Sequence, residues 1–199
     1  MAYSLPTSVF VGNTEYTITN DGDFRMVLDC FSAINDEEMS EDFRVLASLL
    51  IFYDDLNSIE DVGVLSQEDA KTLVEEMFKF FNGGKEESEG AVTSQPVINW
   101  ETDEQIICAG INNVAKTEIR SLPYLHWYTF LGYYMSVGES VLSTVVGIRD
   151  KMNKNKPLEK WEKEFKRDNP DYFIWKPIDI EVKQFEDELR KLWNQGGEK

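Results

Sequence analysis

The densest run of aromatic side chains in this chain is Tyr124-Leu125-His126-Trp127-Tyr128-Thr129-Phe130-Leu131-Gly132-Tyr133-Tyr134-Met135, and it contains the only histidine. Bulky residues recur at positions 124, 127, 128, 131, 134 and 135, a spacing typical of one helical face. Phe130 and Tyr133 lie on the opposite face, so the predicted helix is apolar nearly all round and must be buried on more than one side. A narrow stripe is small or weakly polar: His126, Thr129, Gly132 and Ser136. We interpret this stripe as the place where another helix approaches closely.

Further helices are predicted on both sides of this segment. Pro123 suits the first turn of the aromatic helix, Gly138 ends it, and Ser140 caps a following helix, so the two form a helical hairpin. Capping residues and apolar periodicity predict the other helices. These cover residues 24–34, residues 41–57, the segment from Ser66 to Gly83-Gly84, a segment capped at Thr102-Asp103 that runs to about Lys116, a charged segment after Pro157, and residues 179–193.

A β-hairpin is predicted at the N-terminus. Two runs rich in β-formers, Val9-Phe10-Val11 and Tyr16-Thr17-Ile18, flank Gly12-Asn13, which is a typical turn dipeptide. Such a short hairpin is not stable alone and must pack on helices. The sequence therefore predicts a mainly α fold, a helical domain with a short N-terminal β-hairpin.

The length of 199 residues favours one domain with a shared core. Residues 83–97 lack apolar periodicity and begin Gly-Gly-Lys-Glu-Glu, which predicts a flexible acidic loop. We therefore predict a single domain over residues 1–199. It divides into an N-terminal half of residues 1–82, the loop 83–97, a C-terminal helical half of residues 98–170 and an extra helical tail of residues 171–199.

The formal net charge is −17, which disfavours nucleic acids and anionic membranes as partners and favours basic partners. The charge is uneven, because residues 149–167 hold eight Lys/Arg against four Asp/Glu. Two interpretations of this basic segment stay open: a solvated charged helix, or a contact for an acidic patch in head-to-tail self-association.

The two cysteines, Cys30 and Cys108, each lie within an apolar helical pattern and lack CxxC spacing. They are predicted to be small buried residues in a reducing compartment. The first residues do not form a signal peptide, and no apolar run reaches the roughly 18 residues that span a bilayer. These observations predict a soluble intracellular protein.

Residues for chemistry are sparse. His126 lies between Leu125 and Trp127, which favours a buried packing role over general-base catalysis. Neighbouring acids on a helix point about 100° apart and do not form a catalytic pair. Asp21-Gly22-Asp23 lacks the later ligands of a calcium loop and is better explained by helix capping. The sequence therefore predicts no catalytic, metal or cofactor site.

Several motifs together resemble one protein family. They are Leu5-Pro6-x-x-Val9-x-Val11 with the Gly12-Asn13 turn, Asp23-Phe24-Arg25, Phe78-x-x-Phe81-x-x-Gly84, Trp100-x-x-Asp103, Tyr124-Leu125-His126-Trp127-Tyr128-x-Phe130 and Ile148-Arg149. This combination resembles the tail-assembly chaperones of long-tailed bacteriophages of Gram-positive hosts, encoded just ahead of the tape-measure protein. The resemblance covers about residues 5–170. Tyr128 and Ala109-Gly110 depart from it, because the family pattern has a second Trp and a bulkier pair there.

The resemblance implies a non-enzymatic assembly factor that binds and solubilises the tape-measure protein and helps recruit tail-tube subunits. It implies a homo-oligomer in the host cytoplasm that is absent from the mature virion. Amphipathic helices dock in apolar grooves, and a strong net charge keeps a loaded complex soluble. The candidate partner-binding or packing residues are Leu125, His126, Trp127, Thr129, Phe130, Gly132, Tyr133 and Ser136.

Two alternative functions stay open. One is a structural minor tail or connector protein that is retained in the virion. The other is an acidic decoy that mimics DNA, which should carry its acids at regular intervals along an exposed surface. No such interval is evident in the sequence.

Overall fold

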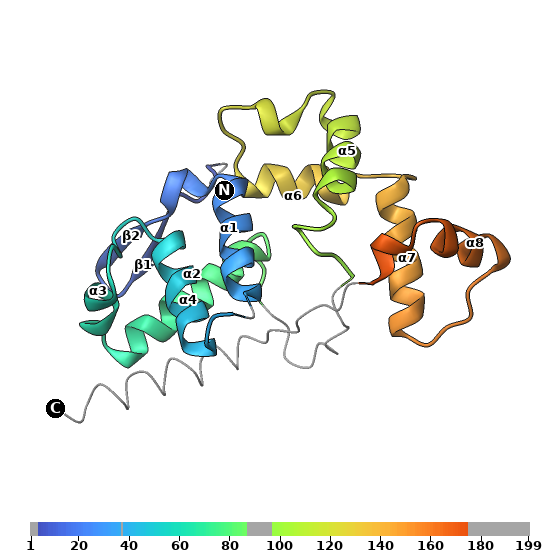
Figure 1. The fold of residues 1–199 in the computed structure, drawn as a ribbon. Helices are drawn as coiled ribbons and strands as arrows, with labels where there is room; N and C mark the ends of the chain where they lie inside the picture. Colours follow the sequence, from blue (N-terminus) through green and yellow to red (C-terminus); the bar gives the residue numbers. More distant parts are fainter. Residues whose placement is uncertain (1–3, 37, 87–96, 175–199) are drawn as a thin grey trace. The chain divides into compact units, whose positions relative to one another are not determined.

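The computed structural model describes residues 4–36, 38–86 and 97–174. Within these ranges the chain forms eight helices and one two-stranded antiparallel hairpin, which confirms the predicted mainly α fold (Figure 1). The predicted helix over residues 179–193 and most of the predicted loop over residues 83–97 lie outside the described residues.

The described chain forms two compact units. The N-terminal unit combines residues 4–86 with the short segment 124–128, and the C-terminal unit combines residues 97–123 with residues 129–174. The N-terminal unit is therefore discontinuous in sequence. The single domain over residues 1–199 and its internal boundaries stay a prediction.

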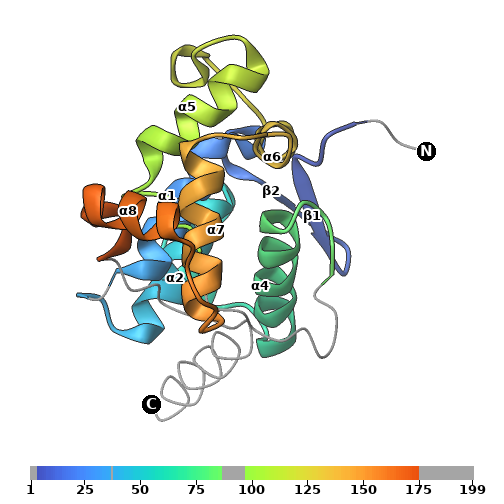
Figure 2. The same ribbon diagram turned by 90° about the vertical axis from the view of Figure 1, so that its right-hand side faces the viewer.

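The N-terminal hairpin is confirmed. Strands β1 (Ser8–Val11) and β2 (Thr14–Thr17) pair antiparallel with Val11 opposite Thr14, so the Gly12-Asn13 turn joins them directly. The hairpin packs on a helix as expected, because β1 contacts α4 (Figure 2). Ile18, which follows β2, is fully buried and extends the apolar side of the hairpin into the core.

Helices α1 (Phe24–Asn35), α2 (Glu41–Phe52), α3 (Ile59–Gly63) and α4 (Gln67–Phe81) build the rest of the N-terminal unit. Helix α1 begins at Phe24 because the Asp23 carboxylate accepts a hydrogen bond from the Arg25 N–H. Ser66 caps α4 in the same way through the Asp69 N–H. Helices α1 and α4 both pack on α2 (Figures 1 and 2).

The prediction of a helix over residues 41–57 is wrong at its end. Helix α2 stops at Phe52, because Tyr53 turns to an extended conformation and bridges to Ile18 beyond β2. The short helix α3 was not predicted. Phe43, although it fits the apolar spacing of this helix, is 57% exposed.

Edge-to-face aromatic contacts fill the core of the N-terminal unit. The Phe52 ring lies 5.3 Å from Phe80 and 5.5 Å from Phe81, and the Phe31 ring lies 5.0 Å from Phe81. Such pairs stabilise by about 0.5–1.5 kcal/mol beyond their buried area. The buried Tyr53 hydroxyl donates to the Leu73 carbonyl oxygen, so its one polar group is satisfied.

The C-terminal unit contains α5 (Glu104–Ala115), the larger part of α6 (Trp127–Met135), α7 (Val141–Asn153) and α8 (Lys160–Asp168). Two short 3₁₀ turns accompany them, Ile119–Ser121 beside α5 and Pro170–Phe173 beside α8. Ser140 caps α7 as predicted, in a reciprocal pair with Ser143. Helix α5 packs on α7 (Figure 1).

The predicted start of the aromatic helix is wrong. Helix α6 begins at Trp127 and not near Pro123, and it ends at Met135, before Gly138. The backbone of Leu125 is bonded elsewhere: its carbonyl accepts from the Phe24 N–H at 2.9 Å, and its N–H donates to the Asp23 carboxylate at 2.8 Å. His126 therefore precedes the helix and is not part of a helical stripe. The helix is also not buried all round, since Gly132 and Met135 are exposed, as is Ser136 just after it.

Cys30 and Cys108 are free and buried, as predicted. Among the described residues, no helix has both the length and the apolar character needed to cross a bilayer.

Candidate binding grooves

Leu125, His126 and Trp127 belong to the core of the N-terminal unit. Trp127 is 1% exposed, and its indole Nε1 donates to the Phe81 carbonyl at 3.0 Å. Its ring lies 5.9 Å from Phe31 in an edge-to-face arrangement. Leu125, also buried, is bonded through its backbone to the start of α1. The segment Leu125–Tyr128 therefore acts as an anchor that closes this unit.

His126 has a defined tautomer. Its Nδ1 accepts a hydrogen bond from the Tyr128 N–H at 3.0 Å, so the ring proton resides on Nε2, which donates to the Pro6 carbonyl at 3.0 Å. Burial lowers the pKa of His126 below its ordinary value, although the Pro6 carbonyl and the nearby Asp21 and Asp23 oppose this shift. The imidazole is thus neutral, with a backbone group on each nitrogen.

Gly22 makes room for this arrangement. Its φ is 76°, and a Cβ there would lie 2.7 Å from the Phe80 ring and 3.1 Å from His126 Nε2. Any other residue at this position would be strained and would also displace a core side chain. The Asp21-Gly22-Asp23 segment is therefore explained by close packing and by the Asp23 cap.

A groove runs between β1 and the C-terminal half of α4, which we call the β1 groove. Its volume is about 300 Å³. It is lined by Pro6, Ser8, Val9, Phe10, Ile18, Glu76, Lys79, Phe80, Gly84 and Tyr128. Phe10 is 66% exposed, and Tyr128 comes from the first turn of the aromatic helix. This groove lies wholly within the N-terminal unit.

A second groove lies within the C-terminal unit, which we call the α5 groove. Its volume is about 190 Å³. One wall is a face of α5, formed by Ile106, Ala109, Gly110, Asn113 and Val114. The other wall is the turn between α6 and α7, formed by Val137, Gly138, Glu139, Ser140 and Val141. A Cβ on Gly110 would lie 3.1 Å from Val137, so the small pair Ala109-Gly110 lets this turn approach α5.

The other candidate residues lie in the C-terminal unit. Phe130 is buried, with its ring 6.0 Å from Trp100, which also lies 5.5 Å from Tyr134. Gly132 is exposed, and a Cβ there would meet no described atom within 4 Å. The remaining candidates are Thr129 and Tyr133, both half-buried, and the exposed Ser136. The predicted set is thus divided between a buried anchor and a partly open helix face.

A buried ion pair in the C-terminal unit was not predicted. Arg149 on α7 is 6% exposed and Asp103 is 1% exposed, and the guanidinium binds both carboxylate oxygens. The same guanidinium donates to the carbonyls of Tyr172 and Val97, at 2.6 and 3.0 Å. Asp103 had been assigned as a helix cap and Arg149 to a basic segment, and both also occur in the motifs that carry the family resemblance. Nothing in the sequence pattern pairs two positions so far apart.

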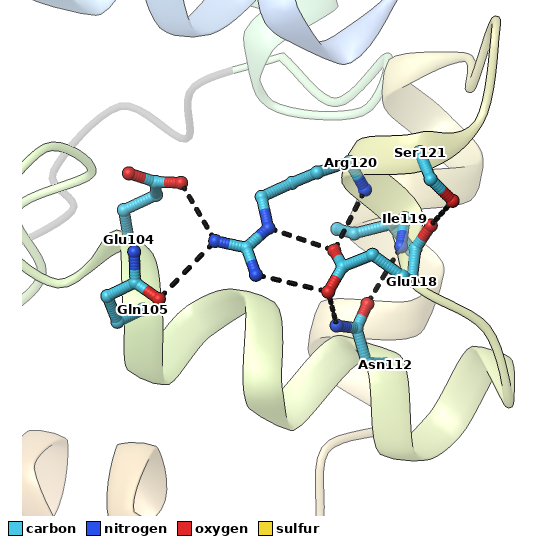
Figure 3. A network of polar contacts seen from close by, with 7 residues as sticks. All are labelled: Glu104, Gln105, Asn112, Glu118, Ile119, Arg120 and Ser121. Atoms are coloured by element: carbon cyan, nitrogen blue, oxygen red, sulfur yellow. Dashed lines mark hydrogen bonds and ion pairs between the residues drawn. The ribbon is translucent and has the colours of Figure 1, made fainter.

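An exposed network holds the 3₁₀ turn on α5 (Figure 3). The Arg120 guanidinium binds Glu118 at 2.9 Å and reaches Glu104 on α5 at 3.3 Å. Asn112 of α5 donates to the Glu118 carboxylate and accepts from the Ile119 N–H. The hydrogen bonds from Arg120 lower the pKa of Glu118 to about 2. The network holds the 3₁₀ turn against α5. Its polar groups bind one another and do not point toward a common position that a ligand could occupy.

The described residues thus form a mainly helical protein with an open groove in each unit. The chain matches the family model described as bacteriophage Gp15 protein over residues 1–172, and it belongs to that family. Searches of curated proteins and of solved structures give no match. The predicted phage origin is thereby confirmed at the level of the family.

Proposed function

We propose that this bacteriophage protein is a tail-assembly chaperone that binds and solubilises the tape-measure protein and helps recruit tail-tube subunits. It acts in the host cytoplasm without catalysis and is absent from the mature virion. Membership of a bacteriophage family supports a structural or assembly role. The resemblance of the motifs around Leu125-His126-Trp127 supports the narrower assignment.

The α5 groove is the observation that carries the proposal. A helical client presents apolar side chains at i, i+3, i+4 and i+7, and these dock in an open apolar groove. The α5 groove offers this, because Ala109 is exposed and Val141 is 49% exposed at its two sides. A tape-measure protein is a long helix, so its apolar stripe fits such a channel.

Two further observations support the proposal. The net charge of −17 keeps a complex with an aggregation-prone client in solution. The neutral His126, with both nitrogens bonded to backbone groups, supports a role without acid–base catalysis. The exposed cations Lys160 and Lys163 on α8 complement an acidic surface on another copy, which supports a homo-oligomer.

The test is co-expression with the tape-measure protein encoded by the same phage. The wild-type chain should keep the client soluble and co-purify with it. Ala109→Glu places a charge in the α5 groove and should abolish the complex. Gly147→Glu is the matched control, because it adds the same charge at an exposed position of α7 where a Cβ meets no described atom within 4 Å. A client that stays insoluble with the wild-type chain would refute the proposal.

A structural minor tail or connector protein is the alternative function, and membership of a phage family fits it as well. Mass spectrometry of purified virions separates the two functions. A chaperone should be missing from mature particles, whereas a connector should be present at stoichiometric copy number.

A further inference from the structure

Strand β1 has one paired edge and one open edge. The Ile18 N–H donates to the Thr7 carbonyl at 2.9 Å, which identifies Thr7 and Ile18 as a hydrogen-bonded pair. Pairs alternate along an antiparallel ladder, so Ser8 opposite Thr17 and Phe10 opposite Glu15 are non-hydrogen-bonded pairs. The N–H and C=O groups of Ser8 and Phe10 therefore point away from β2.

The equivalent position on β2 is closed. The Thr17 carbonyl accepts from the Asp54 N–H at 3.0 Å, and the Thr17 N–H donates to the Asp55 carboxylate. Within the described residues, no such bond is made by the outward backbone groups of Ser8 or Phe10. Unpaired backbone groups on an edge strand are a template for another strand. The edge of β2 is thus closed at Thr17, whereas the edge of β1 is open at both Ser8 and Phe10.

The β1 groove follows this edge. Ser8, Val9 and Phe10 line it from the strand, while Phe80 and Tyr128 provide an apolar floor. Phe10 is 66% exposed at the rim, so its ring adds accessible apolar surface to the groove. An added strand would find main-chain partners on Ser8 and Phe10 and apolar surface for alternate side chains.

The charge around the groove selects the partner. Residues 1–86 carry 18 Asp/Glu and 5 Lys/Arg, a formal charge of −13. Glu76 lies in the groove and Glu15 lies opposite Phe10, while Lys79, the cation in the groove lining, is paired with Glu76 at 2.9 Å. A second copy would bring another segment with a formal charge of −13, so edge-to-edge pairing of two hairpins is disfavoured by net repulsion.

We propose that the open edge of β1 binds an extended, net basic segment of a partner protein by strand addition. The partner strand pairs with the backbone of Ser8 and Phe10 and places alternate apolar side chains in the β1 groove. This site is distinct from the α5 groove assigned to a helical client, and the failure of either leaves the other intact.

The test uses three synthetic peptides with the ¹⁵N-labelled full chain. The first alternates Lys and Val over seven residues, the second replaces Lys by Glu, and the third is the first peptide with every amide N-methylated. At low salt the first peptide should shift the amide resonances of residues 8–11 and bind at least about tenfold more tightly than the second. The third should not bind, because it cannot donate to the strand. Equal binding of the first and third peptides, or shifts confined to other residues, would overturn the proposal.

Variants of the chain give a second test with matched controls. Phe10→Pro removes the outward N–H without breaking a bond within the hairpin and should abolish binding of the basic peptide. Phe10→Val keeps that N–H and should weaken binding only severalfold. Glu15→Pro removes the outward N–H on the other strand together with one acidic side chain, so binding of the basic peptide should fall less than in Phe10→Pro. Binding by Phe10→Pro at the wild-type level would refute strand addition, and the N-methylated peptide answers the same question if Phe10→Pro does not fold.

Discussion

The two units of this protein use charge in opposite ways. Residues 1–86 carry a formal charge of −13, and their unit is closed by aromatic side chains around Trp127. Residues 97–174 hold 11 Asp/Glu and 10 Lys/Arg, so they are nearly neutral, and a buried Arg149–Asp103 pair lies at their centre. In the first unit the charge of the described residues lies mainly at the surface, apart from the buried Asp23 cap, and it repels acidic partners. In the second it is part of the internal structure.

This difference teaches which substitutions each unit tolerates. In the N-terminal unit, aromatic side chains satisfy buried backbone carbonyls: Trp127 bonds Phe81 and Tyr53 bonds Leu73. In the C-terminal unit the Arg149 guanidinium donates hydrogen bonds to two backbone carbonyls in addition to the Asp103 carboxylate. The first unit should therefore be sensitive to loss of aromatic volume, and the second to loss of a single charge.

The largest effect is expected for Arg149→Met. The substitution leaves the buried Asp103 carboxylate without a cation and two carbonyls without a donor, which should lower the free energy of unfolding by about 5 kcal/mol. Urea denaturation followed by circular dichroism measures the loss, and hydrogen exchange should locate it in α5 and α7. Adding Asp103→Leu removes the unpaired charge and should restore part of the stability. A double variant less stable than Arg149→Met would show that charge burial is not the cause.

The second-largest effect is expected for Trp127→Ala, which should lower the free energy of unfolding by about 4 kcal/mol. The substitution creates a cavity in the aromatic core and leaves the Phe81 carbonyl without its donor. Denaturation by urea measures it, and amides of α1 and α4 should lose protection first. Trp161→Ala is the matched control, since Trp161 is 50% exposed on α8 and its loss should cost less than about 0.5 kcal/mol. A folded Trp127→Ala protein of normal stability would contradict a core role.

A smaller effect is expected from pH. Burial lowers the pKa of His126, so its contribution to folding is complete above the ordinary value of 6.5 and is lost as the pH falls through the lowered pKa. Because the chain has a single histidine, ¹⁵N resonances of the imidazole report this titration directly. We expect the Nε2–H tautomer and a midpoint below 6.5. A midpoint above 6.5 would contradict the dominant effect of burial on the pKa, and a proton on Nδ1 of the neutral ring would disprove the hydrogen bonds assigned to it.

The smallest effect on stability is expected for Arg120→Ala, because its network is exposed (Figure 3). The main change is local: the pKa of the Glu118 carboxyl should be about 2 in the wild type and should rise towards 4.5 in the variant. The favourable contribution of Glu118 is present above 4.5 and is lost as the pH falls through 2. Carboxyl ¹³C resonances measure both midpoints. Arg120→Lys, which keeps the charge but not the forked geometry, should give an intermediate midpoint.

Features set by neighbours in sequence could be predicted. The Gly12-Asn13 turn, the Asp23 and Ser66 caps and the Ser140 cap all act over a few residues, and each was found at its predicted place. The apolar periodicity that predicts helices is likewise a local signal. The mainly α fold with its short hairpin was therefore within reach of the sequence.

Features set by distant partners could not be predicted. Tyr53 continues the apolar spacing of α2 but becomes extended because Ile18 bridges to it. Leu125 and His126 fit the helical pattern of the aromatic segment, yet Asp23 draws them into an extended conformation. The buried anchor was therefore mistaken for helix, although its apolar character was recognised.

The candidate grooves depended on the same kind of information. The sequence singled out the aromatic segment as central, whereas the walls of the α5 groove come from α5 and from the turn before α7. The open edge of β1 became apparent only because Asp54 and Asp55 close the corresponding position of β2. Residues that lie far apart in sequence thus define both surfaces.

The discontinuity of the N-terminal unit has a consequence for synthesis on the ribosome. The anchor Leu125–Tyr128 is translated after the whole of α5, so the first 86 residues emerge without the segment that closes their core. Synthesis proceeds at about 5–20 residues per second, so the delay amounts to seconds. During this time the apolar core of the acidic N-terminal segment is incomplete and exposed in the cell. Completion of the first unit is thereby coupled to the synthesis of part of the second.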